Sequence, residues 1–230
     1  QVARSLSVEM HRLGGESAAL LHPSQVEADD LAMQGWAIYF RGLTPDNLQA
    51  AAVLFDNAVA GDDDSVRGWG GVAVAHGMAA YTHWAKDRPA AMRRLHHALD
   101  RLHDLDPHGL HAHVGRSLVA LIASDWDAVL VVNDASIERF PGHSPSHYAR
   151  ALALTRLGRF EECLQAADKA LAIGPRDHQA GAYHLQAGFC HFHRGEFAQA
   201  ARRARLAQEL SPRLDLPPLL LAAAQNHSGD

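Results

Sequence analysis

A pattern of aromatic, small and apolar residues recurs along the C-terminal half of the chain. The segment 158–175 returns as 195–212, with glycine first, an aromatic residue two places later, small residues within and proline last. The segment 124–141 follows the same pattern, with serine in the place of the glycine. Because proline cannot donate the next backbone hydrogen bond of a helix, each closing proline predicts the end of a helix.

The spacing of four prolines gives the length of the repeating unit. Pro107, Pro141, Pro175 and Pro212 close similar phrases and lie 34, 34 and 37 residues apart. A unit of this length holds two antiparallel helices joined by a turn. The glycine or serine lies in the turn, where φ can be positive, and the aromatic residue covers the end of the hairpin. We therefore predict an all-α, right-handed α-solenoid of eleven or twelve helices.

Two less regular units precede the clear repeats, and Thr44 and Pro45 mark a helix start inside the first of them. A helix near 2–13 is predicted before the array and a capping helix at 217–227 after it, which gives a single domain over 1–230. The five predicted hairpins cover residues 28–65, 66–109, 110–143, 144–180 and 181–214.

These features resemble the tetratricopeptide-repeat superfamily. Cys163 and Val129 replace the usual alanine of that family. His113 and His147 replace the usual aromatic residue. The resemblance implies a module that binds protein or peptide partners and uses no cofactor. The family's signature positions are filled by Gly158, Phe160, Ala170, Pro175, Gly188, Gly195, Phe197, Ala200, Ala207 and Pro212.

A narrower resemblance involves the segments 28–37, 43–48, 54–59 and 174–181. They are similar to the repeat region of bacterial regulators that carry an N-terminal winged-helix or adenylate/guanylate cyclase domain. This implies that the chain is the sensory or scaffolding part of such a regulator, with any effector domain upstream of Gln1. A stand-alone adaptor or a self-associating scaffold, including a homo-oligomer, is the alternative.

The resemblance also assigns a concave groove to the first helix of each unit. The assigned residues are apolar and aromatic with few charges, which favours a peptide or helix held by apolar contact. The alternative is that many of them form the core between helices, as expected where a helix is apolar all round. The predicted groove residues are Trp36, Tyr39, His111, Val114, Tyr148, Leu152, Arg156, Leu185, Phe189 and His193.

Composition and charge exclude several classes of protein. The formal net charge is −5 and the basic residues are interleaved with acidic ones, so no basic face for nucleic acid is predicted. No apolar run approaches the roughly 18 residues that would span a bilayer. Cys163 and Cys190 fall among apolar residues of predicted helices, so we expect two buried free thiols, a reducing compartment and a cytoplasmic location.

Seventeen histidines are the most unusual feature of the composition. His96 and His103 lie seven residues apart and share a helix face, but no carboxylate or thiol completes a ligand set. We therefore predict no metal site, with a pH-sensing interface as the alternative. The segment 68–71 lacks the lysine of a phosphate-binding loop and is interpreted as close helix packing. The segments 62–64 and 142–146 are interpreted as a helix-capping turn and a linker, so no catalytic residue is predicted.

Overall fold

The computed structural model describes residues 23–228, and these residues form eleven α-helices and no strand. The prediction of an all-α solenoid is therefore confirmed. The predicted helix near 2–13 lies outside the described residues. The helices are α2 (Pro23–Tyr39), α3 (Pro45–Gly61), α4 (Val66–Tyr81), α5 (Arg88–Leu105), α6 (Leu110–Ala123), α7 (Trp126–Arg139), α8 (Ser144–Arg156), α9 (Phe160–Ile173), α10 (Ala180–His193), α11 (Phe197–Leu210) and α12 (Leu216–Ser228).

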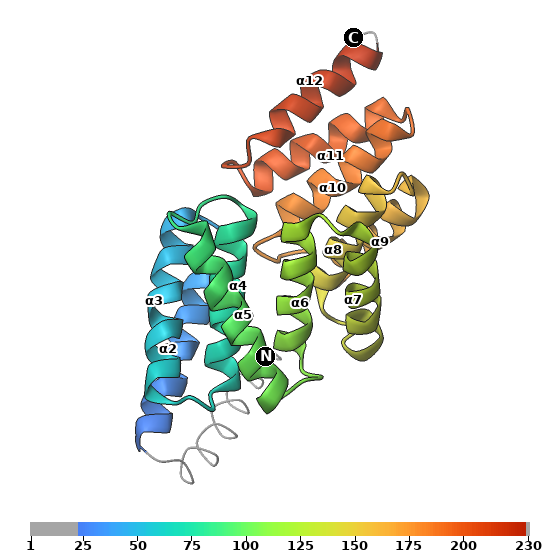
Figure 1. Ribbon diagram of the computed structural model, residues 1–230. Coiled ribbons are helices and arrows are strands. Elements are labelled where there is room, and N and C mark those ends of the chain that lie inside the picture. Colours follow the sequence, from blue (N-terminus) through green and yellow to red (C-terminus); the bar gives the residue numbers. More distant parts are fainter. Residues whose placement is uncertain (1–22, 229–230) are drawn as a thin grey trace, which may run out of the picture.

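The helices form five consecutive hairpins, from α2/α3 to α10/α11, followed by the unpaired α12 (Figure 1). In Figure 1 the chain runs from the α2/α3 hairpin at the left to α12 at the top. The main helix–helix contacts are made within a hairpin or between neighbouring hairpins. This is the packing of a repeat array, in which each unit buries its apolar surface against the next.

The turn inside each hairpin contains one residue with positive φ. Gly158 and Gly195 both have φ of 74°, as their predicted turn positions require. Ser124 occupies the equivalent place in the α6/α7 hairpin with φ of 56°. The two upstream hairpins place Gly42 (φ 144°) and His83 (φ 60°) in their turns. A residue with positive φ thus lies in the turn of every hairpin, and three of the five are glycine.

The predicted N-cap residue is confirmed at the start of α3 but is wrong at the start of α4. Thr44 Oγ1 accepts a hydrogen bond from the backbone N–H of Asn47 (3.1 Å), and Pro45 opens α3 as predicted. The acidic triplet is predicted to cap the next helix, but Ser65 does so, accepting from the N–H of Gly68 (3.1 Å). The acidic residues pair with Arg101 of α5 instead, through Asp63 and Asp64.

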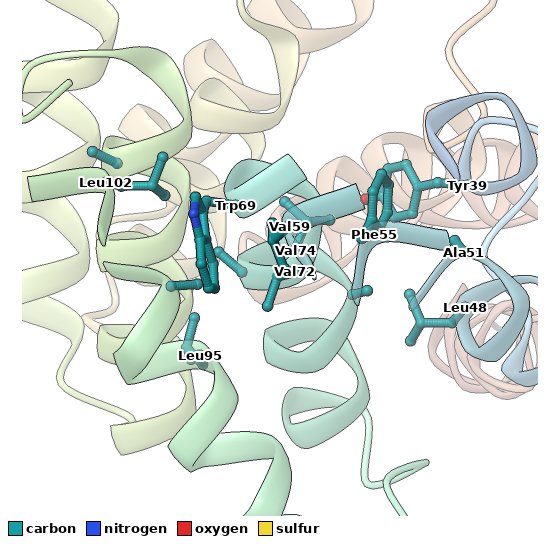
Figure 2. Close-up of a cluster of buried hydrophobic side chains, with 14 residues drawn as sticks. Tyr39, Leu48, Ala51, Phe55, Val59, Trp69, Val72, Val74, Leu95 and Leu102 are labelled. Carbon is teal, nitrogen blue, oxygen red and sulfur yellow. The ribbon is translucent and has the colours of Figure 1, made fainter. Parts of the chain in front are cut away.

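Figure 2 shows the core of the N-terminal hairpins, with Trp69 toward Leu95 of α5 and Phe55 toward Tyr39 of α2. Glycines in α4 allow this packing. A Cβ atom on Gly71 would overlap the ring of Phe55. The interpretation of the glycine-rich segment as close helix packing is therefore confirmed.

Small residues make up much of the core of the C-terminal hairpins. Ala151, Ala170 and Ala207 are completely buried. Cys163 of α9 and Cys190 of α10 are also completely buried, but they form a disulfide, with their Cα atoms 6.4 Å apart. The expectation of two free thiols is therefore wrong, and it no longer supports a reducing compartment. The stacking of the fifth hairpin on the fourth brings these cysteines together, although 27 residues separate them in sequence.

Substitution of Gly188 tests this packing. A Cβ atom on Gly188 would lie 2.8 Å from Leu220 Cδ2 of α12 and 3.3 Å from Arg203 Cβ of α11. Gly188→Leu should therefore lower the free energy of unfolding by about 1–3 kcal/mol through overpacking, measured by urea titration. Gly142→Leu is the matched control, because a Cβ atom on Gly142 meets nothing within 4 Å. Equal stability of the two variants would contradict the predicted crossing.

Candidate functional site: the first-helix face

The ten residues predicted to line a groove all lie on first helices of the hairpins, namely α2, α6, α8 and α10. Together with Phe40, we refer to them as the first-helix face. Tyr39 and Leu185 are buried and offer little surface to a partner. Arg156 and His193 are exposed, and Phe40 is 57% exposed. The half-buried members are Trp36, His111, Val114, Tyr148, Leu152 and Phe189.

At the N-terminal end of the face, Trp36 and His111 stack with ring centroids 5.5 Å apart. Trp36 also donates from Nε1 to the backbone carbonyl of Arg67 at 3.3 Å, and it meets Phe55 edge-on at 5.2 Å. Burial lowers the pKa of His111, with the nearby Arg67 acting in the same direction. The neutral imidazole is therefore favoured, and it extends the apolar surface of Trp36 from α2 to α6.

In the middle of the face, Tyr148 of α8 packs against Tyr183 of α10 with ring centroids 5.1 Å apart. Burial raises the pKa of both phenols, so they stay neutral near pH 7. The Tyr183 hydroxyl donates to Asp177 Oδ2 at 2.9 Å. The middle of the face is thus tied to the segment that precedes α10.

The two exposed polar members of the face, Arg156 and His193, pack against aromatic rings of second helices. The Arg156 guanidinium lies 5.6 Å from the Trp126 ring centroid, and the His193 ring stacks on Phe160 at 4.8 Å. The flat faces of the Arg156 guanidinium and the His193 ring are thus packed against aromatic rings. Their nitrogen atoms remain available to form hydrogen bonds with a ligand. Phe189 lies at the C-terminal end, packed against the cluster that contains Leu220 of α12.

The sequence analysis assigns the segment 174–181 only a resemblance to bacterial regulators, and it predicts no site residue in the polar linker between α9 and α10, residues 174–179. Asp177 accepts hydrogen bonds from Ser144 Oγ (3.0 Å), from Tyr183 and from the backbone N–H of Gln179 (3.0 Å). His178 Nδ1 lies 2.9 Å from Asp177 Oδ1. Burial alone would raise the pKa of Asp177, but these partners outweigh it and hold the pKa well below its usual range. The sequence signals for this linker were the longer spacing before Pro212 and the resemblance of the segment 174–181.

A second polar group surrounds the start of α8. His143 Nδ1 lies 2.8 Å from Ser146 Oγ, which lies 2.9 Å from Ser136 Oγ. Burial lowers the pKa of His143 to about 4, although the Asp177 carboxylate acts in the opposite direction. Ser146 is buried and hydrogen-bonded to Ser136 of the preceding hairpin, so the group fastens two hairpins together.

Residues 23–228 contain neither a metal-ligand cluster nor a membrane-spanning helix. Within this range, no three histidine, cysteine, aspartate or glutamate side chains converge in a way that could hold a metal ion. Among the helices of the same range, none is both long and apolar enough to cross a bilayer.

Comparisons with known proteins identify the repeat and the fold. Residues 144–177 match the family described as tetratricopeptide repeat. No curated protein matches the chain significantly. A thermophilic tetratricopeptide protein of Thermus thermophilus, TTC0263, is 15% identical, with a TM-score of 0.63 over 86% of this chain and 99% of that chain.

Two further solved structures have a similar architecture. Human IFIT1, solved as a dimer with m7Gppp-AAAA, is 16% identical, with a TM-score of 0.66 over 88% of this chain and 47% of that chain. MamA of Desulfovibrio magneticus RS-1 is 17% identical, with a TM-score of 0.52 over 84% of this chain and 98% of that chain. Residues 144–177 thus match a tetratricopeptide repeat, and the chain has the fold of a tetratricopeptide-type α-solenoid.

Proposed function

We propose that the chain is a protein-interaction module whose first-helix face binds a peptide or an amphipathic helix. The observation that supports this most directly is the row of half-buried aromatic and aliphatic side chains on that face, including Trp36, Tyr148 and Phe189. Aromatic side chains bring large contact area at low entropic cost, which makes them the usual anchors of protein interfaces. Arg156 and His193 flank the row and supply polar atoms that would orient the ligand.

The charge distribution supports an apolar ligand over an acidic one. Arg156 and His193 are the only ionisable side chains on the first-helix face besides His111 and the phenols of Tyr39 and Tyr148. Affinity for the partner should therefore fall only weakly as salt is added. Nucleic acid would instead give a steep salt dependence through phosphate contacts.

The narrower proposal is that the module is the sensory or scaffolding part of a bacterial regulator. It rests on the resemblance of the segments 28–37 and 54–59 to the repeat regions of such regulators. The coding sequence upstream of Gln1 tests it, because a winged-helix or cyclase domain in the same reading frame is expected. An isolated repeat array would favour the alternative of a stand-alone adaptor or self-associating scaffold.

The binding proposal is tested by selecting ligands from a phage-displayed random peptide library and measuring the affinity of a selected synthetic peptide by fluorescence anisotropy. Tyr148→Ala combined with Phe189→Ala should weaken binding by at least tenfold, because anchor residues each contribute on the order of 1–2 kcal/mol or more. The affinity should change little between low and moderate salt.

The matched control removes apolar side chains of second helices. Val131 of α7 is 70% exposed and Val53 of α3 is 55% exposed, so Val131→Ala with Val53→Ala should leave the affinity unchanged. Circular dichroism first establishes that both double variants retain the helical content of the parent. If the folded Tyr148/Phe189 variant binds the peptide as tightly as the parent, the first-helix face is not the binding site.

A further inference from the structure

Among residues 23–228, one set of contacts joins the first hairpin to the linker before the fifth, farther along the array than the Trp36–His111 stack between the first and third hairpins. Gln179 Nε2 donates to the hydroxyl of Tyr39 at 3.3 Å, across 140 residues of sequence. The His178 ring meets Tyr39 edge-on at 5.1 Å and Phe40 at 5.4 Å. In an ideal repeat array each unit contacts only its neighbours. This contact instead connects the end of α2, in the first hairpin, to the linker that precedes α10 in the fifth.

The linker 174–179 has the length that this contact needs. The linkers before α4, α6 and α8 each contain four residues, whereas the linker before α10 contains six. In Figure 1 this linker extends from the base of α10 toward the N-terminal hairpins. The longer linker includes the residues that touch α2, so the additional length coincides with the contact to the first hairpin.

The linker side of the contact is held by several hydrogen bonds. Asp177 is fixed by Ser144 of α8 and Tyr183 of α10, and it also accepts from the N–H of Gln179 and contacts His178. The side chain of His178 is only 10% exposed. The fourth and fifth hairpins therefore present His178 and Gln179 to α2 in one defined position.

The α2 side of the contact is less complete. Tyr39 is 7% exposed, but Phe40 remains 57% exposed although its ring touches His178. A shallow pocket of about 490 Å³ opens between Phe40 and the linker, lined also by Pro175 and Arg176. One long hydrogen bond between neutral groups and two edge-on ring contacts make a small interface. Contacts of this size can open and close without unfolding the helices that carry them.

We infer that Tyr39, Phe40, His178 and Gln179 form a latch that holds the array closed, by fastening the first hairpin to the linker before the fifth. The inference deepens the proposed function and rests on it in one respect, namely that the first-helix face is where a partner binds. Tyr39 and Phe40 belong to that face, so the closed latch occupies part of it with a segment of the same chain. A partner can bind this part of the face only when the latch is open. Its apparent affinity therefore falls in proportion to the fraction of molecules in which the latch is open.

The latch is tested without any partner, by double electron–electron resonance on the oxidised full chain. Spin labels at Val53→Cys of α3 and Leu210→Cys of α11 report the distance between the first and fifth hairpins, because both positions are exposed and the native cysteines are paired. Phe40→Ala with Gln179→Ala should move the distribution to longer mean distance and broaden it. Tyr39→Phe, which removes only the hydroxyl acceptor, should produce a smaller change in the same direction.

The matched control is Phe140→Ala. The Phe140 ring meets His113 at 5.9 Å, a ring–histidine contact between the linker before α8 and the adjacent α6. Removing it should leave the distance distribution of the parent unchanged. A folded Phe40/Gln179 variant whose distribution coincides with that of the parent overturns the latch, whether or not the first-helix face binds peptide. A longer distance in that variant supports the latch even if no peptide is found, so the latch and the proposed function can fail separately.

Discussion

Loss of the Cys163–Cys190 disulfide is expected to lower the free energy of unfolding by roughly 3–4 kcal/mol. The bond closes a loop of the chain between residues 27 positions apart. Closing such a loop removes conformational entropy from the unfolded chain, and the effect grows slowly with loop length. The measurement is a urea titration of the protein with and without dithiothreitol. A count of free thiols in denaturant, none before reduction and two after it, verifies the redox state.

A cysteine-free variant for this experiment can be designed from the preceding junction between hairpins. At the preceding junction between hairpins, the positions equivalent to the two cysteines are filled by Val129 and Ala153, and both are completely buried. Cys163→Val with Cys190→Ala therefore substitutes side chains that already pack at that position in the same fold. This variant should match the reduced parent in stability and should not respond to dithiothreitol. An identical urea midpoint for the oxidised and reduced parent would show that the bond contributes nothing.

Acidification from pH 6.5 to pH 4 is expected to destabilise the fold by about 3 kcal/mol through His143 alone. Burial lowers the pKa of His143 to about 4 in the folded chain, whereas an unfolded histidine titrates near 6.5. Between these values the unfolded chain binds the proton and the folded chain does not. The free energy of unfolding therefore falls as the pH falls through this window, and the loss is complete below pH 4.

The measurement compares urea titrations of the parent and of His143→Asn across that window. Asparagine suits the helix start that His143 occupies and cannot titrate, so the variant should gain about 3 kcal/mol relative to the parent between pH 7 and pH 4. Ser146→Ala keeps the imidazole while removing its hydroxyl partner, and it should retain the pH slope of the parent. Parallel curves for the parent and His143→Asn would contradict the assignment.

Protonation of Asp177 changes the free energy of unfolding at lower pH than protonation of His143 does. Its pKa is held below the usual range, so the stability that it contributes is fully present above the pKa of an unfolded aspartate, near 3.9. That contribution is lost as the pH falls further, toward the folded pKa. The window from pH 6.5 to 4 therefore reports mainly on histidines, with His143 as the residue shifted to about 4.

The sequence could predict which residues belong to the candidate site, but not which of their side chains are exposed to a partner. The repeat period located the first helices, and the resemblance to tetratricopeptide repeats selected the ten positions, all of which lie on those helices. Neither could separate the buried Tyr39 and Leu185 from the exposed Arg156 and His193, because a first helix contacts two neighbouring helices as well as the interior of the array. The role of the face as a binding site stays a prediction until the peptide experiment is done.

The sequence by itself determined the helices, the hairpins and the turns of this protein. Those features depend on local chemistry: Pro45 opens a helix, Gly158 and Gly195 accept positive φ, and small residues such as Ala170 let neighbouring helices approach. Such residues act within one or two units of the array, so their spacing is sufficient to identify them.

Only the tertiary structure decided the contacts between units. The disulfide requires Cys163 and Cys190 to meet across a junction between hairpins, and the latch requires Gln179 to reach Tyr39 across the array. Both depend on how much each hairpin rotates relative to the one before it. These small rotations accumulate along the array and are set by the packing of many side chains together, so no single segment of sequence specifies them.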